Sequence, residues 1–269
     1  MRITHFNRVA MRRLLILLCF ISIAGASNSQ VLISLLLGDK LNSDGLEFGL
    51  DGGFGWNDLV GAEGNFNRNF NLGFYFDFKF PNRSWMVHTG VIVKSTMGGK
   101  DLNVYSLGDP ELDSVFVNGS IERRLSYFNV PVMIKHIFPQ RIYFEGGFML
   151  GLRHKAIDVF KQSTYDKDDT QFTNNIKDHI KQFDAGLIGG VGYKLKKSIG
   201  MYISVRYYYG LMDITVGDKF TEQNNSTIYA CIGVPIGAGK AAKTNADFNV
   251  AKTPYSLSFS KFNNSSYIF

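Results

Sequence analysis

The chain has 269 residues, of which 14% are aromatic, 19% are charged and 28 are glycine. No Pro/Ser-rich linker or change in composition divides its middle, so we expect a single domain rather than two. The formal net charge of +6 does not indicate a nucleic-acid partner, because four of the arginines lie in a segment that we expect to be removed. Without them the charge falls to about +2.

That segment, residues 1–26, is predicted to be a secretory signal peptide. It has a basic region ending in Arg12 and Arg13, an apolar stretch over 14–24, and small residues in an A-x-A arrangement at 24–26. The apolar stretch is far shorter than the roughly 20 residues of a membrane-spanning helix. Only Cys231 remains after cleavage, so no intramolecular disulfide can form.

Residues 27–46 are predicted to form an N-terminal periplasmic segment. Its apolar run over 31–37 has two interpretations: it belongs to a signal sequence that is cleaved late, or it lies as a short helix or strand across the mouth of the following domain. Beyond this run, the mature chain contains no stretch of 18 or more apolar residues, which excludes a helical membrane protein.

Eight stretches then alternate apolar and polar side chains with the period of a β-strand. The clearest is 70–80, which places Phe70, Leu72, Phe74, Phe76, Phe78 and Phe80 on one face. One such strand could also lie in a soluble β-sandwich, but the lengths fit tilted transmembrane strands. The eight predicted strands are 47–58, 70–80, 84–97, 123–137, 141–155, 181–194, 200–214 and 227–237.

The connections between these stretches alternate between short and long. Tight turns are expected at 81–83, 138–140 and 195–199, and polar loops at 59–69, 98–122, 156–180 and 215–226. In bacterial outer-membrane barrels the short turns face the periplasm and the long loops face outside, an ordering that a soluble sandwich or lipocalin is not expected to keep. The sequence therefore predicts an all-β protein: an eight-stranded antiparallel up-and-down transmembrane β-barrel over 47–237, followed by a polar C-terminal tail over 238–269.

The inward face of this predicted barrel carries charges of both signs. An eight-stranded barrel is only wide enough to be filled by its own side chains, and an unpaired charge there would cost several kcal/mol. We therefore expect a salt-bridged plug rather than a proton relay or an active site. Outward aromatics near strand ends fit interfacial girdles; they are Trp56, Phe70, Phe80, Trp85, Tyr193 and Tyr209. The predicted inner charged set is Asp51, Asp77, Lys79, His88, Lys94, Lys135, Glu145, Arg153, Asp184 and Arg206.

Four segments in order, 127–135, 144–151, 183–193 and 205–211, resemble strands of the outer-membrane β-barrel domain family. This family includes PorT-like proteins of bacteria with gliding motility and type IX secretion, and small porin-like barrels. The resemblance implies an integral protein of the cell outer membrane, and the relatives with a known role serve secretion or motility complexes. The chain departs from the family at Asn129, where Glu is frequent, and in continuing beyond Gly239.

The favoured function is accordingly a non-enzymatic outer-membrane barrel, structural or part of an envelope assembly, that presents its extracellular loops. We expect contacts with outer-membrane lipid and with envelope proteins through the loops or the periplasmic face, and no nucleic acid, cofactor, metal or catalytic residue. A small passive pore is the alternative, against which the charge-filled lumen argues. A lipid-modifying enzyme is the third class; its candidate residues are His154, His179, Asp158 and Ser163.

Overall fold

The computed structural model describes residues 42–43, 45–81, 84–163, 169–195 and 200–236. The predictions about the signal peptide, the apolar run 31–37 and the tail 238–269 lie outside these residues. None of the helices among the described residues is long and apolar enough to cross a bilayer.

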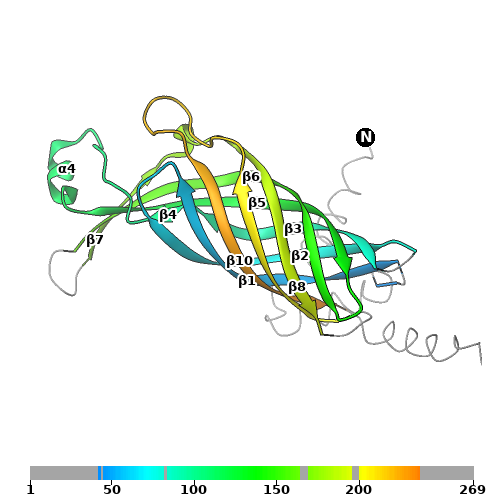
Figure 1. Ribbon diagram of the computed structural model, residues 1–269. Coiled ribbons are helices and arrows are strands. Elements are labelled where there is room, and N and C mark those ends of the chain that lie inside the picture. Colours follow the sequence, from blue (N-terminus) through cyan, green and yellow to red (C-terminus); the bar gives the residue numbers. More distant parts are fainter. Residues whose placement is uncertain (1–41, 44, 82–83, 164–168, 196–199, 237–269) are drawn as a thin grey trace, which may run out of the picture.

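Eight long strands form a closed ring (Figure 1). Each pairs antiparallel with the next long strand in the chain, and β1 pairs with both β2 and β10, which closes the ring. The predicted fold class, an up-and-down barrel, is confirmed. The long strands are β1 Leu46–Val60, β2 Asn65–Lys79, β3 Trp85–Met97, β5 Ser120–Ile137, β6 Ile142–Ser163, β8 Phe183–Lys194, β9 Tyr202–Gly210 and β10 Asn224–Pro235.

The two ends of the barrel differ in their connections. Short connections join β2 to β3, β5 to β6 and β8 to β9, at the end where Gly49 of β1 pairs with Pro235 of β10; we call this the turn end. The opposite end, the loop end, carries the short elements β4 Gly99–Lys100, α4 Pro110–Phe116, β7 Asp169–Asn175 and η2 Lys177–His179, and Figure 1 shows α4 and β7 beyond the ring. By the rule for bacterial barrels, we expect the turn end to face the periplasm.

Several strands extend further toward the loop end than predicted. Strand β2 begins at Asn65, and β6 continues to Ser163, where it forms a hairpin with β7. Most of the predicted loop 59–69 and the start of 156–180 are therefore strand. Beyond the bilayer polar side chains are tolerated on both faces of a strand, so the apolar alternation fades while the backbone ladder continues.

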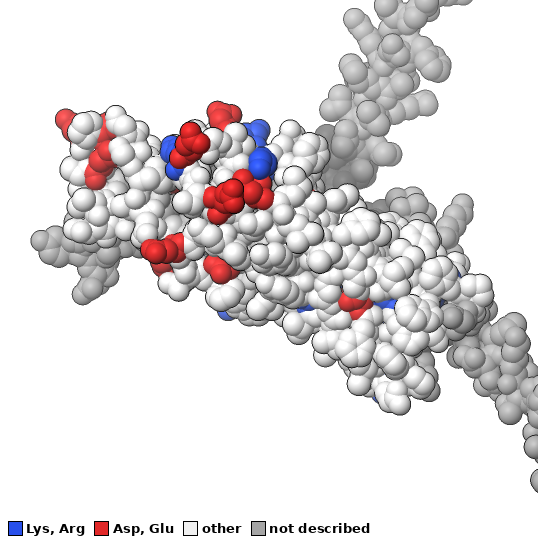
Figure 2. Space-filling view, turned by 45° about the horizontal axis from the view of Figure 1, so that its top comes forward, with Lys and Arg blue, Asp and Glu red and all other residues white. Residues whose placement is uncertain are grey.

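The outer wall is apolar and the inner face is polar. Along β9, Ile203, Val205, Tyr207 and Tyr209 are exposed, while Tyr202, Ser204, Arg206 and Tyr208 are buried. The aromatics Trp56, Phe70, Phe80, Trp85 and Tyr209 are also exposed on the wall. Figure 2 shows charged residues mostly toward the loop end, with little charge on the rest of the wall seen in that view. Exposed side chains of this kind need hydrocarbon around them.

Candidate functional site

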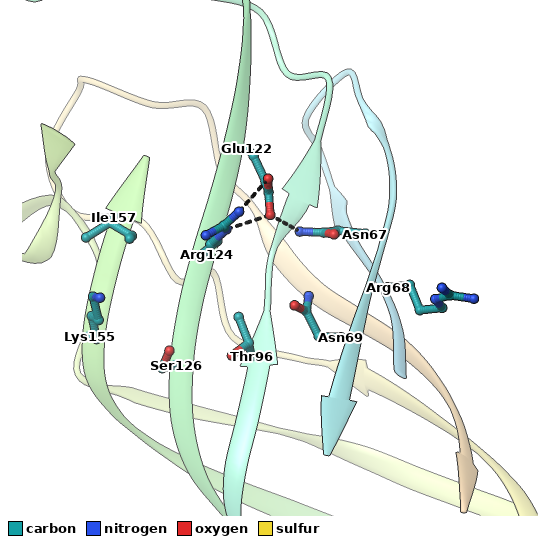
Figure 3. A pocket seen from close by; sticks show the side chains of 9 residues that line it. All are labelled: Asn67, Arg68, Asn69, Thr96, Glu122, Arg124, Ser126, Lys155 and Ile157. Carbon is teal, nitrogen blue, oxygen red and sulfur yellow. Dashed lines mark hydrogen bonds and ion pairs between the residues drawn. The ribbon is translucent and has the colours of Figure 1, made fainter. Parts of the chain in front are cut away.

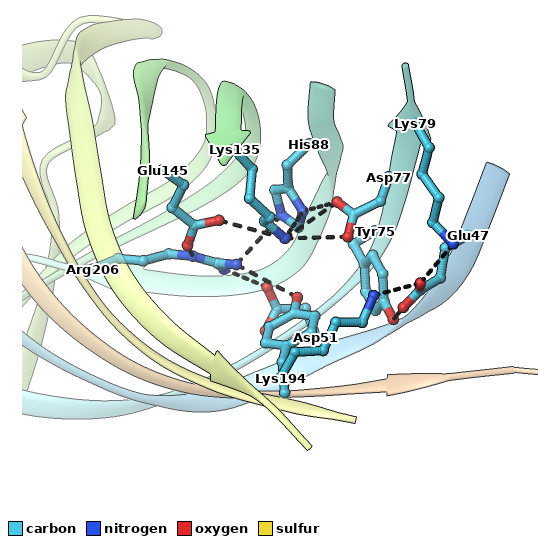
Figure 4. A network of polar contacts seen from close by, with 11 residues as sticks. Glu47, Asp51, Tyr75, Asp77, Lys79, His88, Lys135, Glu145, Lys194 and Arg206 are labelled. Carbon is cyan, nitrogen blue, oxygen red and sulfur yellow. Dashed lines mark hydrogen bonds and ion pairs between the residues drawn. The ribbon is translucent and has the colours of Figure 1, made fainter. Parts of the chain in front are cut away.

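The turn-end half of the interior holds a network of charged side chains that we call the plug (Figure 4). Four carboxylates and four cationic groups lie within it, together with His88, and all are buried or nearly so. Equal numbers of the two signs allow each charge to find a partner without water, which offsets the cost of burying it. The eight charged residues are Glu47, Asp51, Asp77, Lys79, Lys135, Glu145, Lys194 and Arg206.

Arg206, from β9, lies at the centre of the plug. Its Nε donates to Oε1 of Glu145 at 2.5 Å, and its Nη1 donates to Oδ2 of Asp51. Its Nη2 lies 3.4 Å from Nε2 of His88 and 3.4 Å from the hydroxyl oxygen of Tyr202. One guanidinium thus joins residues of β1, β3, β6 and β9 across the lumen, a task that suits its planar set of five donors.

Two further clusters complete the plug. Lys135 lies 3.2 Å from Asp77 and 3.5 Å from Glu145, and Asp77 also contacts Nδ1 of His88 at 2.6 Å. Nearer the turn end, Glu47 accepts from Lys194 at 2.6 Å. Glu47 also lies 3.1 Å from Lys79 and accepts from the hydroxyl of Tyr75 at 3.2 Å. Because Glu145 contacts both Lys135 and Arg206, the central two clusters form one connected unit.

Tyrosine rings fill the space around these charges. Tyr75, Tyr143 and Tyr202 pack together, and Nζ of Lys135 lies 4.8 Å from the ring centres of both Tyr143 and Tyr202, within range of a cation–π attraction. The rings fit because glycine faces them from a neighbouring strand. A Cβ added to Gly233 would lie 2.1 Å from the ring of Tyr202, so no other residue fits there without displacing the ring.

The structure brings together six of the ten charged residues predicted from the sequence. Asp51, Asp77, His88, Lys135, Glu145 and Arg206 form the connected unit, while Lys79 lies in the neighbouring cluster with Glu47. Glu47 and Lys194 were missed, because each lies near the turn end of its strand. Their inward register, shared with Asp51 in β1 and Gly192 in β8, is the signal that could have found them.

Three predicted members lie elsewhere. Lys94 is on the outer wall, with its Nζ 5.4 Å from the ring centre of Phe70; the prediction that it faces inward is wrong. A bulge causes this, since β3 advances from Ile92 to Ser95 while β5 moves only from Asn129 to Tyr127, and one extra residue reverses the alternation. Arg153 faces inward, but it donates to the backbone carbonyls of Lys181 and Lys177.

Asp184 is the third of these residues, and it is not an ion-pair partner of Arg206. Its carboxylate accepts a hydrogen bond from Nδ2 of Asn225 at 2.8 Å, whereas Arg206 pairs with Asp51 and Glu145. Asn129, where relatives often have Glu, donates to the hydroxyl of Ser95 at 2.9 Å. The position is therefore filled by a neutral polar pair rather than by another carboxylate.

The loop-end half of the interior is filled differently, mainly by apolar side chains. Leu125, Tyr127, Met149, Ile188 and other residues of the wall pack there with residues of the loops. One buried ion pair stands among them: Arg123 donates to both oxygens of Asp158, at 2.9 and 2.7 Å. Arg123 also donates to Gln223 at 2.7 Å, and Tyr105 donates to Asp158 at 3.1 Å. The pair therefore connects two loops to the wall.

An aromatic cluster joins the loops above this ion pair. Phe160 of β6 packs edge-on against Tyr105 and Phe116, at centroid distances of 5.1 and 5.7 Å. Tyr105 packs in turn against Phe220, whose ring centre lies 3.9 Å from the guanidinium carbon of Arg123. We call the described residues of the loops 98–119, 164–182 and 211–223 the loop layer.

Asp213 stabilises one turn of the loop layer. It accepts hydrogen bonds from the backbone N–H groups of Thr215 and Gln223, at 3.0 and 2.9 Å, and lies 3.1 Å from Nζ of Lys181. Partial burial alone would raise its pKa. The hydrogen bonds to the ionised form outweigh this effect and lower the pKa of Asp213 from 3.8 to about 2.

Three of the four residues considered for an enzyme have separate surroundings, and the side chain of the fourth, Ser163, is not among those described. His154 is exposed with its ring 4.7 Å from that of Phe128, Asp158 is buried against Arg123, and His179 lies against Phe220. Among the described residues, no group of three or more His, Cys, Asp or Glu side chains is placed to hold a metal ion. Cys231 is buried as a free thiol. Between the two halves of the interior, the cavity beside Asp51, Arg206 and Cys231 measures about 10 Å³, enough for one water molecule at most.

A comparison with family models agrees with this architecture. The family model described as "Outer membrane protein beta-barrel domain" matches residues 30–216. A comparison with curated proteins gives no match. Among solved structures, the chain is similar to Ail, the attachment invasion locus protein of Yersinia pestis, with 13% identity, a TM-score of 0.39, and coverage of 71% of this chain and 99% of Ail.

Two other small barrels are similar to a comparable degree. Neisserial surface protein A has 10% identity and a TM-score of 0.36, with coverage of 71% of this chain and 98% of that protein. OprG from Pseudomonas aeruginosa has 16% identity and a TM-score of 0.31, with coverage of 72% and 97%. The family model matches most of the chain, and the ring is closed with an apolar outer wall. This chain therefore belongs to the outer membrane protein β-barrel domain family and resides in the cell outer membrane.

Proposed function

We propose that this protein is a non-conducting, non-enzymatic barrel that holds its loop layer in one fixed arrangement for contact with envelope partners. The observation that carries the proposal is the buried Arg123–Asp158 pair, which binds Tyr105 and Gln223 from two different loops. A buried pair with both partners satisfied fixes geometry more firmly than an exposed one. The loops thus act as a continuation of the barrel interior.

The filled interior argues against the alternative of a small passive pore. The plug spans the lumen at the turn end, and the apolar core with the loop layer covers the loop end. Purified protein in planar bilayers should therefore show no discrete conductance steps. Conductance steps that disappear when a lumen-facing residue is substituted would contradict the proposal and favour the pore.

The surface of α4 is the part of the loop layer that we expect to touch a partner. Val117, beside α4, is 67% exposed, and Val115 of α4 is 45% exposed. Apolar side chains so accessible at a protein's outer end are typical of interaction sites. Tyr105, Leu107, Phe116 and Phe160 line a hollow of about 200 Å³ beside them.

The test is site-specific photo-crosslinking from position 117 in intact cells. A discrete crosslinked product should appear and should be lost in the variant Val115→Asp. Asn118→Asp serves as the matched control, since it places the same charge on an exposed neighbouring residue. Loss of the product in both variants, or its absence altogether, would contradict a partner at this surface.

A further inference from the structure

Cationic side chains are distributed unevenly around the outer wall. Within the described part of the chain, the outward faces of β8, β9, β10 and β1 carry no Lys or Arg. The outward faces of β2, β3, β5 and β6 carry five, against one carboxylate, Glu122. They are Arg68, Lys94, Arg124, Lys155 and Lys161. The outer surface of these four strands is therefore basic at the loop-end border of the apolar wall.

A pocket of about 490 Å³ lies on this basic side (Figure 3). Arg124 and Ser126 of β5, Lys155 of β6 and Thr96 of β3 line it, and Arg68 and Asn69 of β2 form its remaining edge. The pocket lies where β2 leaves β3: β2 pairs with β3 up to Leu72, and at Asn65 and Phe66 it pairs with β4 instead. Residues 67–71 of β2 therefore have no hydrogen-bonded neighbour on the side of β3, and this gap between the strands makes space for the pocket.

The height of the pocket follows from the strand register. Ser126 pairs with Lys155 and with Thr96, and the next outward residue of β5 toward the turn end is Phe128, whose partner is Leu152. Phe128 and Leu152 are exposed apolar residues of the wall. Two residues along a tilted strand advance about 5 Å along the barrel axis. The polar row thus begins directly above the hydrocarbon band, at the level of the outer-leaflet headgroups.

The positive charge in the pocket exceeds what its own carboxylate can balance. Glu122 accepts from Arg124 at 2.6 Å and from Lys161 at 2.6 Å. Lys155 forms no ion pair with another described residue, whereas Arg68 points away from Arg124 and Glu122 (Figure 3), with its guanidinium carbon 5.5 Å from the ring centre of Phe54. Arg124, Lys155, Ser126 and Thr96 therefore give the pocket more donors than Glu122, the carboxylate that lines it, can satisfy.

We propose that this pocket binds the phosphate group of a glycolipid headgroup in the outer leaflet. Arginine and lysine donors are the groups that recognise phosphate in proteins, and Ser126 and Thr96 add hydroxyl donors. The adjoining exposed Phe128 and Leu152 would contact the acyl chains of the same lipid. The proposal does not depend on the role of the loop layer.

The experiment uses the full mature barrel, refolded in a zwitterionic detergent, with three probes: lipid A bearing its phosphates, lipid A with the phosphates removed, and inorganic phosphate. Native mass spectrometry measures bound lipid, and thermal unfolding measures stabilisation. Wild-type protein should retain phosphorylated lipid A and unfold at a higher temperature with it. Arg124→Gln combined with Lys155→Gln should weaken binding at least about tenfold, which corresponds to about 1.4 kcal/mol.

Two control variants keep the result interpretable. Arg124→Lys combined with Lys155→Arg preserves both charges and should retain at least part of the binding, whereas Lys177→Gln, which removes an exposed cation of the loop layer, should bind like the wild type. Heat-modifiable migration on gels shows whether each variant is folded. Equal retention of both forms of lipid A, or equal binding by the folded double Gln variant, would overturn the proposal. A shift produced equally by inorganic phosphate would overturn the lipid as the occupant.

Discussion

The two halves of the barrel interior are filled by opposite kinds of chemistry beneath the same apolar wall. At the turn end four carboxylates face four cationic groups among tyrosine rings. At the loop end leucine, isoleucine, methionine and phenylalanine side chains surround the Arg123–Asp158 ion pair. Exposed aromatic and aliphatic side chains form the wall outside both halves, although the wall of β2, β3, β5 and β6 becomes basic toward the loop end.

The difference reflects what covers each half. Among the described residues only short connections lie at the turn end, so its side chains must fill the lumen and satisfy one another across it. The loop end is covered by Leu102, Phe116, Ile176 and Ile214 from the loops, which enter the same core as the wall residues. Burial of apolar area therefore attaches the loop layer to the barrel, while directional ion pairs hold the strands of the turn end together.

The largest expected effect comes from breaking the centre of the plug. Arg206→Met should lower the free energy of unfolding by about 3–5 kcal/mol, because it leaves the buried carboxylate of Asp51 without its partner and deprives Glu145 of one of two. Denaturant unfolding in lipid vesicles measures this change. Adding Asp51→Asn should restore part of the loss.

Asp184→Asn is the control for that rescue, since Asp184 binds Asn225 and not Arg206. Combined with Arg206→Met, its effect should simply add to that of the single variant. Rescue by Asp184→Asn and not by Asp51→Asn would show that the partners of Arg206 differ from those described.

A smaller effect is expected from the apolar half. Leu125 is fully buried between Met97 of β3 and Ala156 of β6. Leu125→Ala should cost about 2–4 kcal/mol through the cavity that it leaves, with no second charge change able to restore it. Leu125→Met keeps the volume and should cost less than about 1.5 kcal/mol. If the two substitutions were equally harmful, close packing would not be what stabilises this half.

The smallest expected effect concerns pH and the loop layer. The folded pKa of Asp213, about 2, lies below its ordinary value of 3.8. Its ionised form therefore stabilises the fold above about pH 4, and this contribution is lost as the pH falls toward 2. Hydrogen exchange at the amides of Thr215 and Gln223, which donate to Asp213, should accelerate over that range after correction for intrinsic rates. In Asp213→Asn the acceleration should disappear.

The sequence was sufficient to predict the fold and most facings, for physical reasons. Lipid demands an unbroken apolar row on one side of each strand, so the period of two is strong wherever the strand crosses the bilayer. The prediction of side-chain direction fails at Lys94, because a bulge in β3 turns this side chain outward and the sequence gives no signal of the bulge.

The partners inside the barrel could not be predicted in the same way. Which inward side chains meet across the lumen depends on the stagger of the whole ring; Asp184 and Arg206 lie on adjacent strands yet bind different residues. Arg123 and Asp158 were also missed as a pair, although they are direct cross-strand partners in β5 and β6. Their strands were predicted to end near this point, so their register could not be used.

The closure of the ring by β1 and β10 has a consequence for biogenesis. The side chains of Asn57 and Thr227 meet across this seam although 170 positions separate them in the chain. Until the last strand is made, β1 lacks one of its two hydrogen-bonding neighbours, and an open strand edge is not tolerated in hydrocarbon. The ring can therefore close only once β10 is available, and the free edge of β1 must be paired or shielded from hydrocarbon until then.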